Sequence, residues 1–232
     1  KVERSMPLQA SASAYTKTAW YIKKGPDGNI YILPHGYILL YRYNVTTKEL
    51  QSSGTTPIAG MTAGYGLVFD EEGNIYFGTF PTPNIYKCDK DLNIVQEYSN
   101  VFPGERYVMS MAYYNGKIYA GGQAPTTSFV SIDVKTGEVT KLKQPEETYP
   151  SAKVVNYYMM DSIDNLIFCT TKNEDRSSYC LAYDADKSDW VLQLPRGYGF
   201  WLPPYKVNGK TYVLSAPASA PTTEVGLYEI DL

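Results

Sequence analysis

A repeat of about 45 residues is the feature that most constrains how this chain can fold. Five segments share one pattern, in which a turn residue precedes a short strand rich in Ile, Tyr, Val and Phe. They are GNIYIL (28–33), GNIYFG (73–78), GKIYAG (116–121), DNLIFC (164–169) and GKTYVL (209–214). The intervals between their second residues are 45, 43, 48 and 45. Such regular spacing predicts five structural units of the same kind in series.

A second sequence pattern follows each of these five segments, and the two patterns together define one repeating unit. It is a strand that ends in Asn or Asp: YILLYRYN (37–44), NIYKCD (84–89), FVSID (129–133), YCLAYD (179–184) and GLYEID (226–231). After four of these come a tight turn and one more strand, and Asp or Asn at such a turn accepts hydrogen bonds from backbone amides. Each unit therefore reads as a four-stranded antiparallel meander. The sequence predicts an all-β fold, a five-bladed β-propeller of four-stranded antiparallel blades.

The last blade lacks its outer strand, because the chain stops at Leu232. Prolines close the other outer strands at Pro57, Pro103, Pro145 and Pro195, and VERSMP (2–7) has the same form. We expect an N-terminal outer strand to complete the ring and remove an exposed sheet edge; the alternative is a fragment of a larger ring. This predicts one domain over residues 1–232, with blades at about 14–52, 60–98, 106–143, 152–194 and 198–232 and the outer strand at 1–7.

Two segments carry a resemblance to known proteins, GNIYFG…NIYKCD…NIVQEY (73–98) and GKIYAGG…FVSIDVKTGEVTKL (116–142). They resemble the broad superfamily of streptogramin-lyase-like, NHL-like and quinoprotein-like propellers. The resemblance implies the fold only. That superfamily includes hydrolases, lyases, lectins and protein-binding scaffolds, so the function has to be argued from the site.

Composition restricts the partners. The formal net charge is −3 and the pI about 5.3, with no run of Lys and Arg, so no nucleic-acid partner is expected. No apolar stretch reaches the 18 or so residues of a membrane span. The chain has 23 Tyr against 7 Phe and 3 Trp, and tyrosine suits half-buried strands and wet binding surfaces. This composition favours a secreted or cell-surface protein.

The loops between the two middle strands lengthen along the chain, from PHG (34–36) to SAPASAPTTE (215–224), whereas the opposite turns stay short. This asymmetry indicates a working face that also carries the crossings from one blade to the next. Each crossing holds a tyrosine beside charged or aromatic residues, which suits sugar rings. The alternative is that these tyrosines are structural and pack beneath the start of each strand. The candidate ligand-binding residues are Tyr15, Tyr65, Glu105, Arg106, Tyr107, Tyr149, Arg196, Tyr198 and Trp201.

Catalytic motifs are sparse. His35 is the only histidine, which excludes a multi-histidine metal centre, and no G-x-S-x-G elbow is present. His35 as a base and Arg106 as a cation remain the catalytic candidates, for a lyase acting on acidic polysaccharides. No metal site and no cofactor are expected.

The three cysteines cannot all pair within the chain. Cys169 ends one middle strand of the fourth unit and Cys180 lies near the start of the next, so a symmetric hairpin would bring them together as a disulfide. The alternative to this disulfide is that both cysteines are reduced and pack as small side chains in the core.

Binding is favoured over catalysis. The first hypothesis is an extracellular binding module for a glycan or another extracellular ligand. The alternatives are a polysaccharide lyase-like propeller enzyme and a scaffold domain that docks a protein partner.

Overall fold

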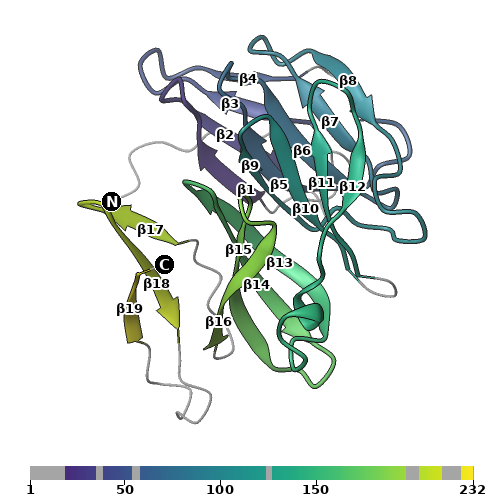
Figure 1. Cartoon of the computed structure of the whole chain (residues 1–232). Helices are drawn as coiled ribbons and strands as arrows, with labels where there is room; N and C mark the ends of the chain where they lie inside the picture. The colour runs from purple at the N-terminus through teal and green to yellow at the C-terminus, as the bar shows by residue number, and fades with distance from the viewer. Residues whose placement is uncertain are drawn as a thin grey trace. The chain divides into compact units, whose positions relative to one another are not determined.

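A computed structural model describes residues 19–34, 39–53, 58–123, 127–196, 204–215 and 226–231, which form antiparallel sheets in series (Figure 1). The helical structure in these ranges is one 3₁₀ turn, η1 (Pro145–Glu147), so none of the helix described here has the length and apolar character of a membrane span. The chain divides into two compact units, unit 1 (Lys1–Val101) and unit 2 (Phe102–Leu232), which are described separately.

Unit 1 contains blades 1 and 2, each a four-stranded sheet in sequence order. Blade 1 consists of β1 (Ala19–Lys24), β2 (Ile30–Pro34), β3 (Tyr41–Tyr43) and β4 (Leu50–Ser52). Blade 2 consists of β5 (Ala63–Phe69), β6 (Ile75–Phe80), β7 (Ile85–Cys88) and β8 (Ile94–Tyr98). The two sheets share one core, in which Leu33 and Leu40 pack with Ile75 and Phe77.

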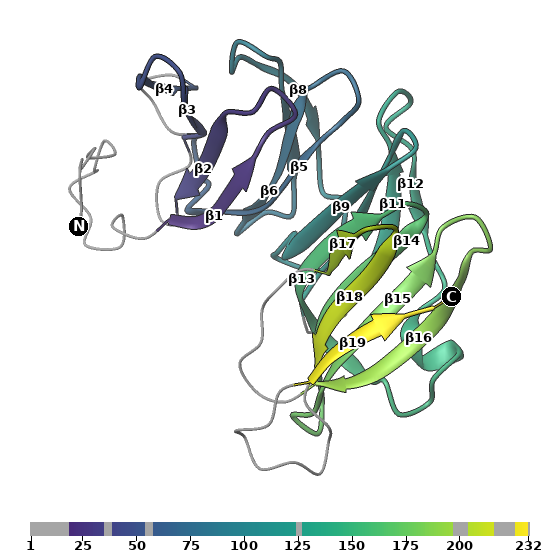
Figure 2. The ribbon, with the colours of Figure 1, turned by 90° about the vertical axis from the view of Figure 1, so that its left-hand side faces the viewer.

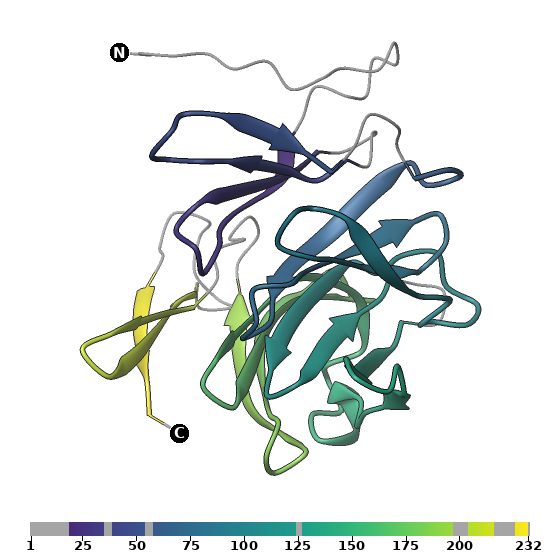
Figure 3. The same ribbon diagram turned by 90° about the horizontal axis from the view of Figure 1, so that it is seen from above.

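Unit 2 contains blades 3, 4 and 5. Blade 3 consists of β9 (Ser110–Tyr114), β10 (Lys117–Gly121), β11 (Phe129–Asp133) and β12 (Val139–Lys141). Blade 4 consists of β13 (Val154–Ile163), β14 (Leu166–Asn173), β15 (Ser178–Asp184) and β16 (Asp189–Arg196). Blade 5 has the described strands β17 (Tyr205–Val207), β18 (Lys210–Ser215) and β19 (Gly226–Ile230). Figures 2 and 3 show these sheets in two further directions.

Local turn chemistry explains why the meander forms. Asn115 and Gly116 both have positive φ, 47° and 75°, and join β9 to β10 in a two-residue hairpin; this left-handed conformation is the one that Asn and Gly tolerate. Aspartates and asparagines behave as predicted at the other turns. Each side chain accepts hydrogen bonds from backbone amides two to four residues later, at Asn44, Asp70, Asp89, Asp133 and Asp184.

An aromatic core joins blades 3 and 4. The fully buried ring of Phe129 lies at its centre, with ring centroids 5.0 Å from Trp190, 5.1 Å from Tyr183 and 5.8 Å from Tyr157. Phe168, Cys180 and Val213 form a second cluster that holds blade 5 against blade 4. Blades 3 and 4 are therefore fixed to each other by large buried side chains, and they make a rigid base for the residues at their ends.

The prediction of a five-bladed β-propeller with antiparallel blades is confirmed. Four blades have four described strands and the fifth has three, in the order that the repeat predicts. The expected outer strand at residues 1–7 lies outside the described residues.

The predicted disulfide between Cys169 and Cys180 is wrong. Both are buried free thiols. In the register of β14 and β15, Cys169 lies opposite Leu181 and Cys180 lies opposite Thr170. Neighbouring positions of a strand point to opposite faces, so Cys169 faces blade 3 and Cys180 faces blade 5. Burial raises the pKa of Cys169 well above its usual value, which keeps it a thiol.

Candidate functional site

The irregular ends of blades 3 and 4 meet at one place in unit 2. The amide of Tyr157, near the start of β13, donates to the carbonyl oxygen of Gly122 at 3.2 Å, just after β10 ends. Gln123 forms an isolated antiparallel bridge with Asn156. The crossing into blade 3, residues 102–109, is tied to the same place because the amide of Met109 donates to the carbonyl oxygen of Gly121 at 2.9 Å. We call this region the loop end of blades 3 and 4.

Glu105 points into the protein at this loop end. Its side chain is only 6% exposed, and its carboxylate lies against the backbone of Gly122. A β-carbon at position 122 would lie less than 3.0 Å from a carboxylate oxygen of Glu105, so this packing requires glycine. Within the same crossing Arg106 is exposed and Tyr107 is half-buried. The crossing therefore buries its carboxylate and leaves its guanidinium accessible.

Three more polar side chains are buried at this end of blade 4. Asn156 is 5% exposed, Tyr157 is fully buried and Asn173 is 1% exposed. The hydroxyl of Tyr157 and the amide oxygens of Asn156 and Asn173 make no hydrogen bond in the part of the chain that the structure describes. A buried polar group left in this state costs about 1–3 kcal/mol.

Strand register separates these side chains by face, because Asn156 lies opposite Lys172 and points to the other face of blade 4 from Tyr157 and Asn173. Tyr157 pairs with Thr171, and Asn173 lies two residues further along β14, so Tyr157 and Asn173 share the face of blade 4 that packs on blade 3. The ring of Tyr157 lies against Gly121, where a β-carbon would come within 3.0 Å of three of its atoms. Burial, and then the charges of Cys169, Glu146 and Glu105, raise the pKa of Tyr157 well above its usual value. The hydroxyl therefore keeps its proton.

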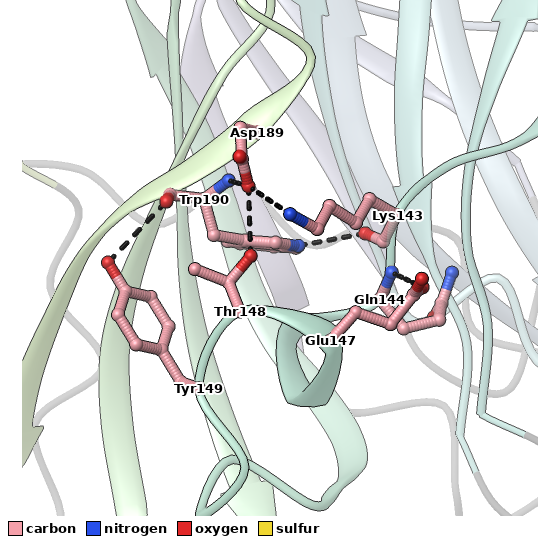
Figure 4. A network of polar contacts seen from close by, with 7 residues as sticks. All are labelled: Lys143, Gln144, Glu147, Thr148, Tyr149, Asp189 and Trp190. Atoms are coloured by element: carbon pink, nitrogen blue, oxygen red, sulfur yellow. Dashed lines mark hydrogen bonds and ion pairs between the residues drawn. The ribbon is translucent and has the colours of Figure 1, made fainter.

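Polar contacts fix the next crossing, from blade 3 to blade 4 (Figure 4). Lys143 and Thr148 both donate to Oδ1 of Asp189 at 2.8 Å, at the start of β16. The indole nitrogen of Trp190 donates to the carbonyl oxygen of Lys143 at 2.8 Å. Tyr149 is half-buried, packs against the aromatic core and makes a long hydrogen bond of 3.5 Å to the carbonyl oxygen of Trp190. These contacts give Tyr149 a supporting role in the crossing.

The Asp189 contacts predict a pH dependence. Hydrogen bonds from Lys143 and then from Thr148 hold the pKa of Asp189 below its usual value. Their contribution to stability is therefore present above the unfolded-state pKa of about 3.9 and is lost as the pH falls through the lower folded-state pKa. We expect Asp189→Asn to destabilise the protein at pH 7, with the difference from wild type shrinking in acid. Urea unfolding at pH 7 and pH 3 measures this.

The matched control is Asp91→Asn, at an exposed position in the turn between β7 and β8. This variant should unfold like wild type at both pH values. A difference between Asp189→Asn and wild type that is equally large at pH 3 would contradict the assignment.

The structure separates the predicted site residues. Glu105, Arg106 and Tyr107 lie together in one crossing, as expected, although Glu105 is turned inward. Tyr65 lies inside β5 and is only 4% exposed, which favours the packing alternative for this residue. The backbone of Arg196 ends β16. The positions Tyr15, His35, Tyr198 and Trp201 lie outside the described residues.

Sequence reasoning missed Asn156, Tyr157 and Asn173. A usable signal was present, because Asn156 interrupts the segment VVNYYMM (154–160), an otherwise apolar and tyrosine-rich innermost strand. A polar side chain in such a strand needs a hydrogen-bond partner.

A hollow of about 260 Å³ lies at the other, short-turn end of unit 1, where Asp27, Glu71 and Glu72 face Lys90. Within its wall, the hydroxyl of Tyr31 donates a hydrogen bond to the carboxylate of Asp27 at 3.0 Å.

In the described ranges no three His, Cys, Asp or Glu side chains gather in the way that a metal ion requires.

Comparisons with known proteins identify the fold. No family model and no curated protein sequence matches the chain. Among solved structures it is similar to virginiamycin B lyase from Staphylococcus aureus, with a TM-score of 0.59 and 14% identity over 91% of this chain. It is also similar to the extracellular domain of a hybrid two component system protein from B. thetaiotaomicron (TM-score 0.60, 16% identity, 93% of this chain). A third is the β-propeller domain of Cps50 (Swd1) from Myceliophteria thermophila (TM-score 0.61, 9% identity, 91% of this chain).

These likenesses concern the fold alone, because every identity is low. The chain spans 69% of the lyase structure, 71% of the Cps50 domain and 28% of the extracellular domain from the two component system. The three proteins also differ from one another in kind, so the site has to carry the functional argument.

Proposed function

We propose that this chain is an extracellular ligand-binding β-propeller that recognises glycans through the loop end of blades 3 and 4. Binding is proposed in preference to catalysis, since the sequence contains a single histidine and no G-x-S-x-G elbow.

One observation carries the proposal. The crossing into blade 3 places an exposed guanidinium, Arg106, and a half-buried aromatic ring, Tyr107, directly after the buried carboxylate of Glu105. An aromatic face supports the apolar C–H face of a sugar ring, and a guanidinium donates hydrogen bonds to its hydroxyls. Phe102 and Val108 of the same crossing are fully buried and anchor it, which lowers the entropy that binding would otherwise cost.

Two further points support the proposal. The sequence has the tyrosine-rich composition of an exported protein. One structural neighbour is an extracellular domain, so a propeller of this kind occurs in that setting.

The test is binding of the purified chain to an array of neutral and acidic glycans, followed by titration of the best ligand. We expect Arg106→Ala and Tyr107→Ala each to weaken binding at least about tenfold, as expected when one contact of about 1.4 kcal/mol is lost. Lys141→Ala, at an exposed position of β12, is the matched control and should bind like wild type.

Equal binding by wild type, Arg106→Ala and Tyr107→Ala would refute this site. An array without any bound glycan, together with a protein that co-purifies with the chain, would favour the scaffold hypothesis instead.

A further inference from the structure

We propose that Asn208 in blade 5 is a site of spontaneous deamidation, and that the hydroxyl of Tyr113 protects the matching residue of blade 3, Asn115, from the same reaction. Deamidation is a covalent modification that replaces a side-chain amide with a carboxylate as a protein ages. The inference concerns two short hairpin turns of unit 2 and does not depend on glycan binding.

The reaction needs only the backbone, one side chain and water. The amide nitrogen of the residue after asparagine loses its proton and attacks Cγ of the side chain, a C–N bond forms, and ammonia leaves as a succinimide ring closes. Water then opens the ring at either of its carbonyl carbons, which gives aspartate or isoaspartate, and nothing is oxidised or reduced. Glycine after the asparagine favours the attack because it has no side chain beside the nitrogen. The state of the glycine amide therefore controls the rate.

The same tripeptide, Asn-Gly-Lys, occurs at two places in the chain, 115–117 and 208–210. Each Asn-Gly pair forms the two-residue turn of a hairpin, β9–β10 in blade 3 and β17–β18 in blade 5 (Figure 1). The φ angles nearly coincide, 47° and 75° in the first turn and 51° and 80° in the second. A β-carbon on either glycine would meet no atom within 4 Å beyond its chain neighbours. Backbone shape and crowding therefore do not distinguish the two sites.

A hydrogen bond distinguishes them. The amide of Gly116 donates to the hydroxyl of Tyr113 at 3.1 Å, so the nitrogen that would attack Asn115 is already engaged. In blade 5 the corresponding position, in the second residue pair from the turn, is Lys206, whose ammonium group offers no acceptor. The amide of Gly209 makes no hydrogen bond to the residues that the structure describes. The attacking nitrogen is therefore free in blade 5 and held in blade 3.

The hairpin of blade 5 is also the shorter one. Three residue pairs join β17 to β18, whereas five join β9 to β10. Ring closure requires the turn to leave its hairpin angles, and a short ladder opens locally at a lower free energy. Asn208 and Gly209 are both exposed to solvent, whereas Gly116 is half-buried. Both differences raise the rate at Asn208 relative to Asn115.

Modification of Asn208 changes the turn itself. In isoaspartate the main chain runs through the side-chain carbon atoms, which lengthens a loop whose length sets the strand register. The pair formed by Val207 and Lys210, which closes the loop, should therefore be lost. Val213 of β18 packs in the cluster that holds blade 5 against blade 4, so β18 should remain in place. We expect the amides of β17 to lose protection against hydrogen exchange.

The experiment incubates the full chain at mildly alkaline pH and follows both sites by peptide mapping, which separates asparagine, aspartate and isoaspartate. In wild type Asn208 should be converted at least about fivefold faster than Asn115, a factor that corresponds to about 1 kcal/mol, the size of one hydrogen bond. Tyr113→Phe removes only the hydroxyl and should raise the rate at Asn115 about fivefold. The rate at Asn208 should not change in this variant, which excludes general unfolding as the cause.

A reciprocal pair of variants tests the hydroxyl in blade 5. Lys206→Tyr places a hydroxyl at the position equivalent to Tyr113 and should slow the conversion of Asn208. Lys206→Phe places the same ring without the hydroxyl, and Asn208 should react faster in it than in Lys206→Tyr. Both variants lose the ion pair with Asp164, so they form a matched pair. In urea, where the hairpins are unfolded, the two asparagines of wild type should react at equal rates because their tripeptides are identical.

Three results would overturn the inference. Conversion of Asn115 at the same rate as Asn208 in the folded wild type contradicts the assignment of the site. An unchanged rate at Asn115 in Tyr113→Phe refutes the protective role of the hydroxyl. A difference between the two sites that persists at full size in urea means that neighbouring residues in the sequence set the rates and the folded structure does not.

Discussion

Replacing Phe129 with alanine is expected to lower the free energy of unfolding by about 3–5 kcal/mol. Its ring is fully buried, and four aromatic rings surround it, those of Trp190, Tyr183, Tyr157 and Tyr119, with centroids between 5.0 and 6.3 Å away. These neighbours belong to two different blades, so they cannot collapse into the space without moving one sheet against the other. Most of the removed volume should therefore remain as a cavity.

Urea unfolding followed by tryptophan fluorescence measures the effect, because Trp190 is part of the same cluster. Phe129→Leu retains most of the side-chain volume and should cost clearly less than alanine. A loss of about 1 kcal/mol or less in Phe129→Ala, which is the size of an average substitution, would contradict the central position of this ring.

Gly121→Ala is expected to destabilise the protein by about 3 kcal/mol, at the upper end for overpacked sites. The new methyl group would lie within 3.0 Å of three atoms of Tyr157, including its Cβ and Cγ, which cannot move without the backbone of β13. Gly121 does not have a positive φ, so backbone strain does not contribute to the cost. The loss of stability therefore reports only on the close approach of blade 3 to blade 4.

A double-mutant cycle is the control for this prediction. In a Tyr157→Ala background the ring is absent, and adding Gly121→Ala should then cost little, which gives a large coupling energy between the two positions. Gly122→Ala offers a comparison, since its methyl group meets the flexible end of Glu105 instead. Equal costs for Gly121→Ala with and without the Tyr157 ring would contradict this account.

The repeat could be predicted from the sequence because each of its signals is local. Asn115-Gly116 encodes a hairpin through positive φ, and Asp133 and Asp184 accept hydrogen bonds from the amides that follow them. Such contacts span two to four residues and recur in blades 1 to 4. The strand order of the blades follows from them.

The candidate site was predicted only in part. Sequence reasoning identified the crossing that contains Glu105, Arg106 and Tyr107, but it treated all three as facing the ligand. Which of them turns inward depends on Gly122, the residue after β10, which leaves room for the carboxylate. The disulfide failed for a similar reason, since a shift of one position in register moved Cys180 to the opposite face from Cys169.

The sequence by itself therefore determined the all-β class and the five repeating units, because turn chemistry and alternation act within a few residues. Only the tertiary structure decided that Tyr157 and Asn173 are buried on the face of blade 4 that packs on blade 3. That grouping depends on the packing of β13 and β14 against blade 3, across contacts that span about 50 residues of sequence, such as the one from Ser110 to Tyr157. No local pattern encodes it, since burial is a property of the neighbours that folding brings to a residue.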